Sequence, residues 1–406
     1  VIFDGQGRKI EAINSLNHSK ITYYDDSRFP WLATRTRDVN GLVSASYYDE
    51  FGRTYAVVSA NGNVSETANY WCTSATCDLS RGEFFYKVSS ATGRADTITY
   101  FDKMTRSIRA KGKGFDGSAG GKAVITETRF NARGNVEWQS LPYFEGALSS
   151  DIYGTTSYYD DLSRTERVTD PADRDSTITY NGLTTIYTGP TSKTKTVYRN
   201  AVGKTREIID SNLKSLYYTY DMWGELAQVI DTEQNTTKIG RNLRGFRTKL
   251  DDPDQGVWLY DYNALGQMVN QTDAKQQITH TTFDVVGRPL TRTSNYNTAD
   301  AETSTWVYDE GFKGIGKLNS LTNNGSVTER YFHEGPYFQL SKVVTDLDGE
   351  SYKSHTAYDA IGRVDEVTYY GEYVDTNEYP QGFTIKNGYH SSLGILDSVK
   401  GITGAE

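Results

Sequence analysis

One short pattern recurs along this chain: an aromatic residue followed by Asp or Asn, a gap of two residues, and often Gly-Arg. It is complete in Tyr48-Asp49-Glu50-Phe51-Gly52-Arg53, Phe283-Asp284-Val285-Val286-Gly287-Arg288 and Tyr358-Asp359-Ala360-Ile361-Gly362-Arg363. The aromatic position falls at Tyr198, Tyr220, Tyr262 and Phe283, with Arg241 in a degenerate copy, so the steps are 22, 21, 21 and 21 residues. A fixed short period constrains the fold strongly, because each unit must stack on its neighbours to bury a face.

The period has the length of one β-hairpin. Strands average ~5–6 residues and hairpin turns take ~2–5, so two strands and two turns use about 21 residues. A second sequence pattern lies between these units and leads to an Asp, as in Val168-Thr169-Asp170-Pro171 and Gln271-Thr272-Asp273. We predict that the Tyr-Asp-x-x-Gly-Arg segment forms one turn of each hairpin and the second Asp segment forms the other. Asp accepts backbone N–H groups two residues on, and Gly supplies positive φ.

The composition supports many short strands joined by many turns. The chain has 31 Tyr, 37 Gly and only 8 Pro, and tyrosine suits a half-buried pleated surface. A lone hairpin is marginal in water, but hairpins stacked edge to edge pair their edges. Strand twist then makes the ribbon coil. The predicted fold class is all-β: a spiral of antiparallel β-hairpins that curls into a hollow shell or barrel, with little helix.

The domain organisation follows from the regularity of the repeats. We expect residues 1–406 to form a single repeat array that is a fragment of a longer protein. The repeats are less regular, with insertions, over 1–150 and regular over 151–370, while 371–406 is predicted to be a degenerate repeat or an edge of the array.

The repeat residues are predicted to be structural: the aromatic residue packs, Asp fixes the turn, and Gly allows the chain to reverse. The residues assigned to this role are Tyr48, Asp49, Gly52, Arg53, Tyr159, Asp160, Tyr220, Asp221, Gly224, Tyr262, Gly266, Phe283, Asp284, Gly287, Arg288, Tyr358, Asp359, Gly362 and Arg363.

The two cysteines, Cys72 and Cys77, have four residues between them. A redox motif normally has two, and a metal site needs further ligands, whereas the five His residues are scattered. A disulfide that closes a small loop is the favoured interpretation, and it indicates an oxidising compartment. We therefore expect a secreted or cell-surface location.

The net charge argues against a nucleic-acid partner, and the hydropathy argues against a membrane span. The chain carries 43 Lys and Arg against 52 Asp and Glu, a net charge of −9, which argues against a nucleic-acid groove. No apolar stretch reaches the ~18 residues of a membrane span.

No pattern predicts catalysis, a metal or a cofactor. Each Asp recurs at a turn, which explains it without a pair of catalytic carboxylates. The run 346–350 lacks the ligand spacing of a calcium loop, and the glycine-rich run 112–123 lacks that of a phosphate loop. We predict a protein that is not an enzyme, with no metal and no cofactor. Aromatic residues in irregular segments are candidates for glycan contact: Trp31, Trp71, Trp138, Tyr143 and Phe144.

The repeated units resemble the YD-repeat (RHS-repeat) family, whose consensus Gly…Tyr-Asp-x-x-Gly-Arg they match over roughly residues 24–370. The resemblance implies a spiral of β-hairpins that forms a hollow shell. Members of the family include bacterial polymorphic toxins, the B and C components of insecticidal toxin complexes, and the teneurin ectodomain.

The resemblance implies a function as the encapsulating shell of a secreted or surface protein. That shell would sequester a C-terminal toxin domain not present here, and its partners would be this cargo or other shell segments of the parent. The alternative is a teneurin-like adhesion or carbohydrate-binding scaffold, with glycans as partners. The self-cleaving core segment that ends the repeats of the toxins is not found before Glu406. The pairs Asp170-Pro171 and Asp252-Pro253 lie at ordinary repeat turns, so no autoproteolysis is assigned.

Overall fold

The computed structural model describes residues 1–114, 121–370, 383–391 and 393–402. Within these ranges the chain forms 35 strands and three short 3-10 helices, and no α-helix. The all-β prediction is confirmed. The described part of the chain also contains no helix with the length and hydropathy needed to cross a membrane.

The strands of the first third are β1 (Ile2–Phe3), β2 (Lys9–Ile13), β3 (Ser19–Tyr23), β4 (Arg35–Arg37), β5 (Val43–Tyr48), β6 (Thr54–Val58), β7 (Val64–Trp71), β8 (Phe85–Ala91), β9 (Thr97–Phe101), β10 (Ser107–Lys113), β11 (Ala123–Phe130), β12 (Val136–Ser140) and β13 (Tyr143–Phe144). The regular middle holds β14 (Gly154–Tyr159), β15 (Thr165–Thr169), β16 (Asp175–Asn181), β17 (Thr184–Thr188), β18 (Thr194–Arg199), β19 (Thr205–Ile209), β20 (Ser215–Tyr220), β21 (Leu226–Ile230), β22 (Thr236–Arg241), β23 (Arg247–Asp252), β24 (Gly256–Tyr262), β25 (Met268–Thr272), β26 (Ile278–Phe283) and β27 (Pro289–Ser294). The remainder is β28 (Glu302–Tyr308), β29 (Leu318–Asn323), β30 (Val327–Phe332), β31 (Lys342–Leu347), β32 (Glu350–Tyr358), β33 (Val364–Tyr370), β34 (Phe383–Tyr389) and β35 (Leu396–Ile402), with the 3-10 helices η1 (Leu79–Arg81), η2 (Ser149–Asp151) and η3 (Pro336–Phe338).

Strands adjacent in sequence pair antiparallel, so the sheet is a long meander of hairpins. In β20, for example, Tyr217 pairs with Glu207 of β19 on one side and with Ile230 of β21 on the other. Among the described strands, only β13 interrupts the order, because it pairs with β11 while β12 continues to β14. The register shifts by one residue at the aromatic position of many repeats, including Tyr159, Tyr220 and Tyr358. Such bulges increase twist and bend a strand, which favours a curled strip.

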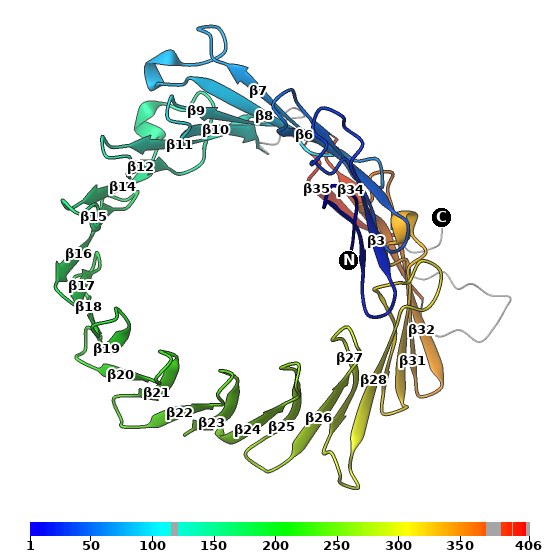
Figure 1. The fold of residues 1–406 in the computed structure, drawn as a ribbon. Coiled ribbons are helices and arrows are strands. Elements are labelled where there is room, and N and C mark those ends of the chain that lie inside the picture. Colours follow the sequence, from blue (N-terminus) through cyan, green and yellow to red (C-terminus); the bar gives the residue numbers. More distant parts are fainter. Residues whose placement is uncertain (115–120, 371–382, 392, 403–406) are drawn as a thin grey trace.

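The strip curls into a ring, and its last strands lie beside its first (Figure 1). Alternate turns fall on opposite edges of the strip. We call one edge the YD rim, which carries the turns at 49–52, 102–105, 131–134, 160–163, 200–203, 221–224, 242–245, 263–266, 284–287, 309–317 and 359–362. We call the other the opposite rim, which carries the turns at 14–17, 38–41, 59–62, 170–173, 210–213, 231–234 and 273–276.

A seam joins the two overlapping ends of the strip. The Asn40 side chain donates to Ile315 O at 2.9 Å and accepts from the Ile315 N–H at 3.1 Å, across 275 residues of sequence. Asn63 Nδ2 donates to Ile361 O at 2.7 Å, across 298 residues. The opposite rim of the first coil therefore stacks on the YD rim of the next one.

The sheet is one layer thick over much of its length and has only a sparse core. The buried apolar residues among those described are Ala56, Tyr100, Ile125, Val197, Tyr260, Val344 and Leu393. None of the large residues in the described ranges, counted with its backbone, falls below 2% exposure. Backbone pairing and cross-strand contacts, such as the stacked rings of Phe246 and Tyr262 at 5.0 Å, must therefore carry most of the stability.

The fourth position of the YD turns has positive φ. It is 75° at Gly52, 83° at Gly224 and 94° at Gly287. Thr105 and Ser163 take the same position at 62° and 61°. The glycines with the largest φ lie furthest from the left-handed region that other residues tolerate.

Replacing Gly287 by Val should therefore destabilise the array, because a β-branched residue pays about 1–3 kcal/mol for such a conformation. Urea-induced unfolding would show a lower midpoint. The control is Gly287→Asn, which should lose less because Asn tolerates positive φ. Thermal unfolding of the Val variant at the wild-type temperature would contradict the assigned role of this turn.

Candidate functional site

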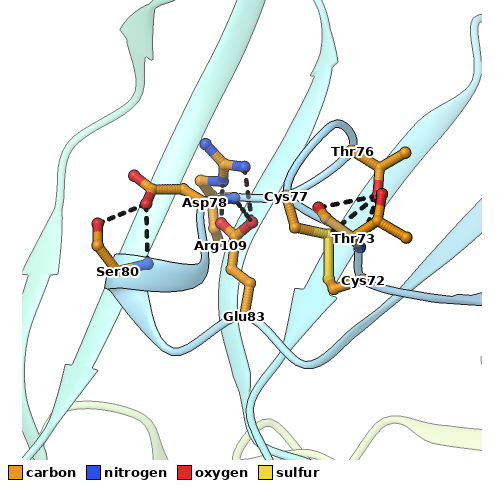
Figure 2. The surroundings of a disulfide bond; sticks show 8 residues. All are labelled: Cys72, Thr73, Thr76, Cys77, Asp78, Ser80, Glu83 and Arg109. Carbon is orange, nitrogen blue, oxygen red and sulfur yellow. Dashed lines mark hydrogen bonds and ion pairs between the residues drawn. A yellow bond between two sulfur atoms is a disulfide. The ribbon is translucent and has the colours of Figure 1, made fainter.

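A group of charged residues lies between β7 and β11 and contains Glu83 and Glu127, which are the buried charged residues of the described chain. Cys72 and Cys77 form a disulfide that closes the loop before η1 (Figure 2). After that loop, the Asp78 N–H donates to Glu83 Oε2 at 2.8 Å. Arg109, on β10, places its Nε 2.7 Å from Glu83 Oε1. The loop is thereby tied to the sheet through one carboxylate.

Glu83 has a side chain that is 0% exposed, and burial, as the main cause, raises the pKa of this carboxyl. The hydrogen bond from Asp78 and the charge of Arg109 act in the opposite direction. A buried carboxylate needs such a partner.

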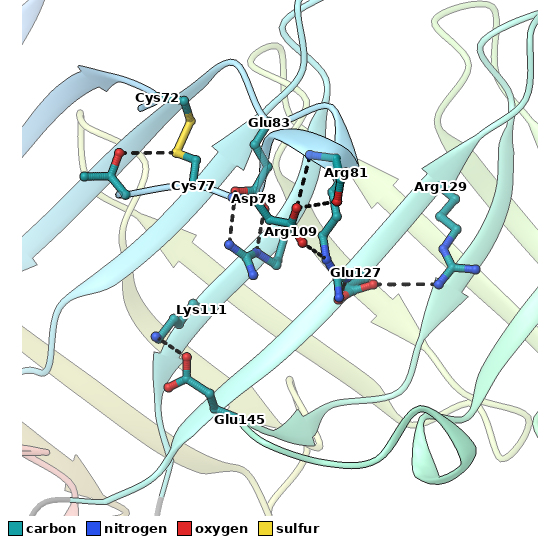
Figure 3. A network of polar contacts seen from close by, with 12 residues as sticks. Cys72, Cys77, Asp78, Arg81, Glu83, Arg109, Lys111, Glu127, Arg129 and Glu145 are labelled. Atoms are coloured by element: carbon teal, nitrogen blue, oxygen red, sulfur yellow. Dashed lines mark hydrogen bonds and ion pairs between the residues drawn. A yellow bond between two sulfur atoms is a disulfide. The ribbon is translucent and has the colours of Figure 1, made fainter. Parts of the chain in front are cut away.

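Glu127 on β11 forms the second half of the group (Figure 3). It accepts hydrogen bonds from Arg81 and from the Tyr143 hydroxyl. Burial, and then Glu127, raise the pKa of Tyr143 to about 12. Arg129 lies 3.9 Å from the same carboxylate and its guanidinium stacks over Trp138 at 4.2 Å.

An open pocket of about 760 Å³ lies over this group and is lined by side chains of both charges. Its carboxylates at 83, 102 and 127 are each paired with an arginine. Opposite charges paired within the wall stabilise the junction of η1, β10 and β11. The sulfur atoms of both cysteines lie within 4.8 Å of a Glu83 oxygen, but the disulfide occupies both sulfurs. The sequence pattern did not point to Glu83, Arg109 or Glu127, because no spacing links them.

The aromatic residues proposed for glycan contact divide into two groups. Trp31 and Trp71 are 66% and 73% exposed, and Phe144 is 43% exposed. The expectation of irregular segments is wrong for Trp71, Trp138, Tyr143 and Phe144, which lie in β7, β12 and β13. Trp138 and Tyr143 are also half-buried, because they pack against Arg129 and Glu127.

The predicted Asp residues of the repeat each fix their own turn. Asp160 Oδ1 accepts the N–H groups of Leu162 and Arg164, both at 2.9 Å, and Oδ2 accepts Arg164 Nε at 2.7 Å. The hydrogen bond from the Arg164 side chain is the main cause that lowers the pKa of Asp160. The Arg four residues on donates its Nε–H in the same way to Asp4, Asp49, Asp102, Asp170, Asp284 and Asp359.

Asn at this position keeps the turn with a different partner. Asn263 Oδ1 accepts the N–H groups of Leu265 and Gln267, both at 3.0 Å. Its amide then donates to Gln267 Oε1 at 2.6 Å. In this turn the fifth residue is therefore Gln267, an acceptor for the amide, in place of the Arg donor.

In many repeats the hydroxyl of a tyrosine connects the repeat to the preceding one. Tyr220 OH donates to Thr205 O at 2.6 Å and Tyr262 OH donates to Arg247 O at 2.9 Å. We call this contact the tyrosine lock. It is also made by Tyr24, Tyr48, Tyr159, Tyr180, Tyr358 and Tyr389.

The basic residue of the preceding turn stacks on the same ring. Arg164 lies 4.2 Å from the ring centre of Tyr180, and Arg363 lies 4.0 Å from that of Tyr389. In the degenerate copy, Arg241 Nη1 donates to Leu226 O at 2.5 Å. A guanidinium thus replaces the phenol in the lock.

The other residues predicted from the repeat motif occupy the corresponding positions of their own turns. The Phe283 ring occupies the aromatic position without a hydroxyl, and Arg288 bridges Asp284 and Asp309 at 2.7 and 2.9 Å. Asp221, whose fifth turn residue is Glu225 rather than Arg, lies 3.8 Å from Arg241. The motif residues are spread along one rim, one set per hairpin.

Removing one hydroxyl from the tyrosine lock should weaken the contact between two repeats. We expect Tyr220→Phe to lower the free energy of unfolding by about 1 kcal/mol, because the Thr205 carbonyl loses a donor. The matched control is Tyr217→Phe on the same strand, where the side chain is 41% exposed and little change is expected. Equal losses for the two variants in urea titrations would refute the lock.

Comparison with known proteins finds no match to the sequence and several matches to the fold. No protein-family model and no curated protein matches the chain. The crystal structure of TcdB2-TccC3 without hypervariable C-terminal region matches with a TM-score of 0.71 and 12% identity over 95% of this chain. The TcdB2-TccC3-Cdc42 structure matches with a TM-score of 0.73 and 12% identity over 96%. The Photorhabdus luminescens Tc holotoxin pore, with the TccC3 mutation D651A, matches with a TM-score of 0.71 and 11% identity over 95%.

This chain spans 27% of the length of each of those solved chains. At such low identity the likeness concerns the fold alone. It agrees with the repeat motif, the hairpin period and the curled strip described above. The chain has the YD-repeat (RHS-repeat) fold.

Proposed function

We propose that this chain is part of the wall of an encapsulating shell, in which a parent protein sequesters a cargo domain. The observation that carries the proposal is the seam. A strip that merely presented loops would gain nothing from closing, whereas the bonds of Asn40 and Asn63 stack one coil directly on the next. The fold match to TcdB2-TccC3 supports the same function.

The wall would act by exclusion. Proteases cleave extended, loosely held segments, and in this strip strand edges are paired while turns are tied by Asp and Arg. Such a wall needs no catalytic residue and no cofactor of its own. The disulfide between Cys72 and Cys77 supports a secreted or surface location, where such bonds persist.

Limited proteolysis of the parent protein tests the proposal. We expect the cargo segment to survive inside the parent and to be digested when produced alone, with mass spectrometry identifying the fragments. Asn63→Asp should expose the cargo, because a carboxylate would face the Ile361 carbonyl across the seam. Asn181→Asp, on an exposed residue outside the seam, is the control. Cleavage of the cargo at equal rates inside and outside the parent would overturn the shell.

Exposed tryptophans favour a second candidate function, a scaffold for adhesion or carbohydrate binding. Trp31 and Trp71 present most of their surface to solvent, and an aromatic face suits a sugar ring. If the strip is such a scaffold, Trp31→Ala and Trp71→Ala should each reduce retention on a glycan array by tenfold or more. Trp138→Ala is the comparison, because that ring packs against Arg129. Wild-type protein without any retention would remove this candidate.

A further inference from the structure

A row of apolar side chains stands exposed along the YD rim. The third residue of the turn is apolar in many repeats, and its side chain is 54% to 78% exposed at Phe51, Met104, Leu162, Val202, Trp223 and Leu265. If these turns faced only water, an apolar side chain at this position would bring no stabilisation. A row of exposed apolar side chains of this kind is typical of an interaction site.

The seam shows what covers this position. Ile361 is the third residue of the turn at 359–362 and is half-buried. Its carbonyl accepts the amides of Asn61 and Asn63 at 3.2 and 2.7 Å. Its side chain lies so close to Gly93 that a Cβ there would come within 2.2 Å of Ile361 Cδ1. The same turn position is thus covered where a coil docks and bare where none does.

The opposite rim supplies the covering partner. At the seam it presents an asparagine as the third residue of its turns, Asn40 and Asn61. The uncovered turn at 210–213 presents Asn212 at that position, followed by Leu213, which is 85% exposed. One chain therefore carries both halves of the contact: the bare apolar residues along the YD rim, and Asn212 on the opposite rim. The turns at 170–173, 231–234 and 273–276 carry Ala172, Glu233 and Lys275 at the same position.

We propose that the bare YD rim is a docking surface for the opposite rim of a second copy of this chain. The interface repeats the seam between molecules. It joins two different surfaces, so the contact is head to tail and need not close after two copies. The inference rests on the seam and not on the proposed cargo.

Charge predicts how this association responds to salt. Each copy carries a net charge of −9, so two copies repel one another, while the seam that the contact repeats is hydrogen-bonded by Asn amides to backbone groups. Screening of the repulsion should therefore strengthen association as salt rises, whereas an interface of ion pairs would weaken.

The test is sedimentation velocity with two complementary variants. The YD-rim variant is Val202→Asp with Leu265→Asp, and the opposite-rim variant is Asn212→Glu with Leu213→Asp. We expect wild-type protein to form species that grow with concentration and salt, and each variant alone to associate at least tenfold more weakly. The two variants mixed should form one-to-one pairs, because each retains the surface that the other lacks. Leu259→Thr, on an exposed strand residue away from both rims, should behave as wild type.

Circular dichroism would show that the variants are folded, and the mixing step separates docking from damage, since misfolded chains do not complement one another. Wild-type protein that stays monomeric at all concentrations would overturn the proposal, as would variants that associate like wild type. Neither result would bear on the shell, which the proteolysis of the parent tests separately.

Discussion

The interaction on which the structure depends is the bond from one side-chain oxygen to two backbone N–H groups of its own turn. Asp160 and Asn263 make it in the same way, although one is charged and the other is not. This bond fixes the reversal of the chain, and a bulge at the preceding aromatic residue adds local twist. The curl of the strip and its rims follow from repeating that unit.

The tyrosine lock then joins one repeat to the next. With few fully buried side chains, stability is close to a sum of hairpin and neighbour terms. Loss of one tyrosine lock should therefore destabilise the contact between two neighbouring repeats and leave distant repeats unchanged. The buried pair of Glu83 and Arg109 is a local exception, where a long loop closed by a disulfide required its own anchor.

Sequence reasoning could predict the parts of the structure that are local. The motif around Tyr220 and Asp221 places the turn, and the period places the hairpin. The seam could not be predicted, because Asn40 and Ile315 are 275 residues apart and neither belongs to a recognisable motif. Trp138 and Tyr143 lie in β12 and β13, where the sequence predicted irregular segments because these strands depart from the repeat period. The pairing of Glu83 with Arg109 could not be predicted because no spacing in the sequence links the two residues.

The lock at Arg241 has a consequence for how such chains change over evolutionary time. The acceptor of this lock is a backbone carbonyl, which every residue carries. The donor can be any polar group on a side chain that is long enough to reach that carbonyl. Tyr220 and Arg241 meet that requirement with unrelated side chains. Substitutions at the position are therefore limited by the reach and packing of the side chain rather than by residue identity, and Phe283 occupies it with no hydrogen-bonding group. Most residues of such a chain can be substituted while the strip keeps its curvature, which accounts for a shared fold at 12% identity.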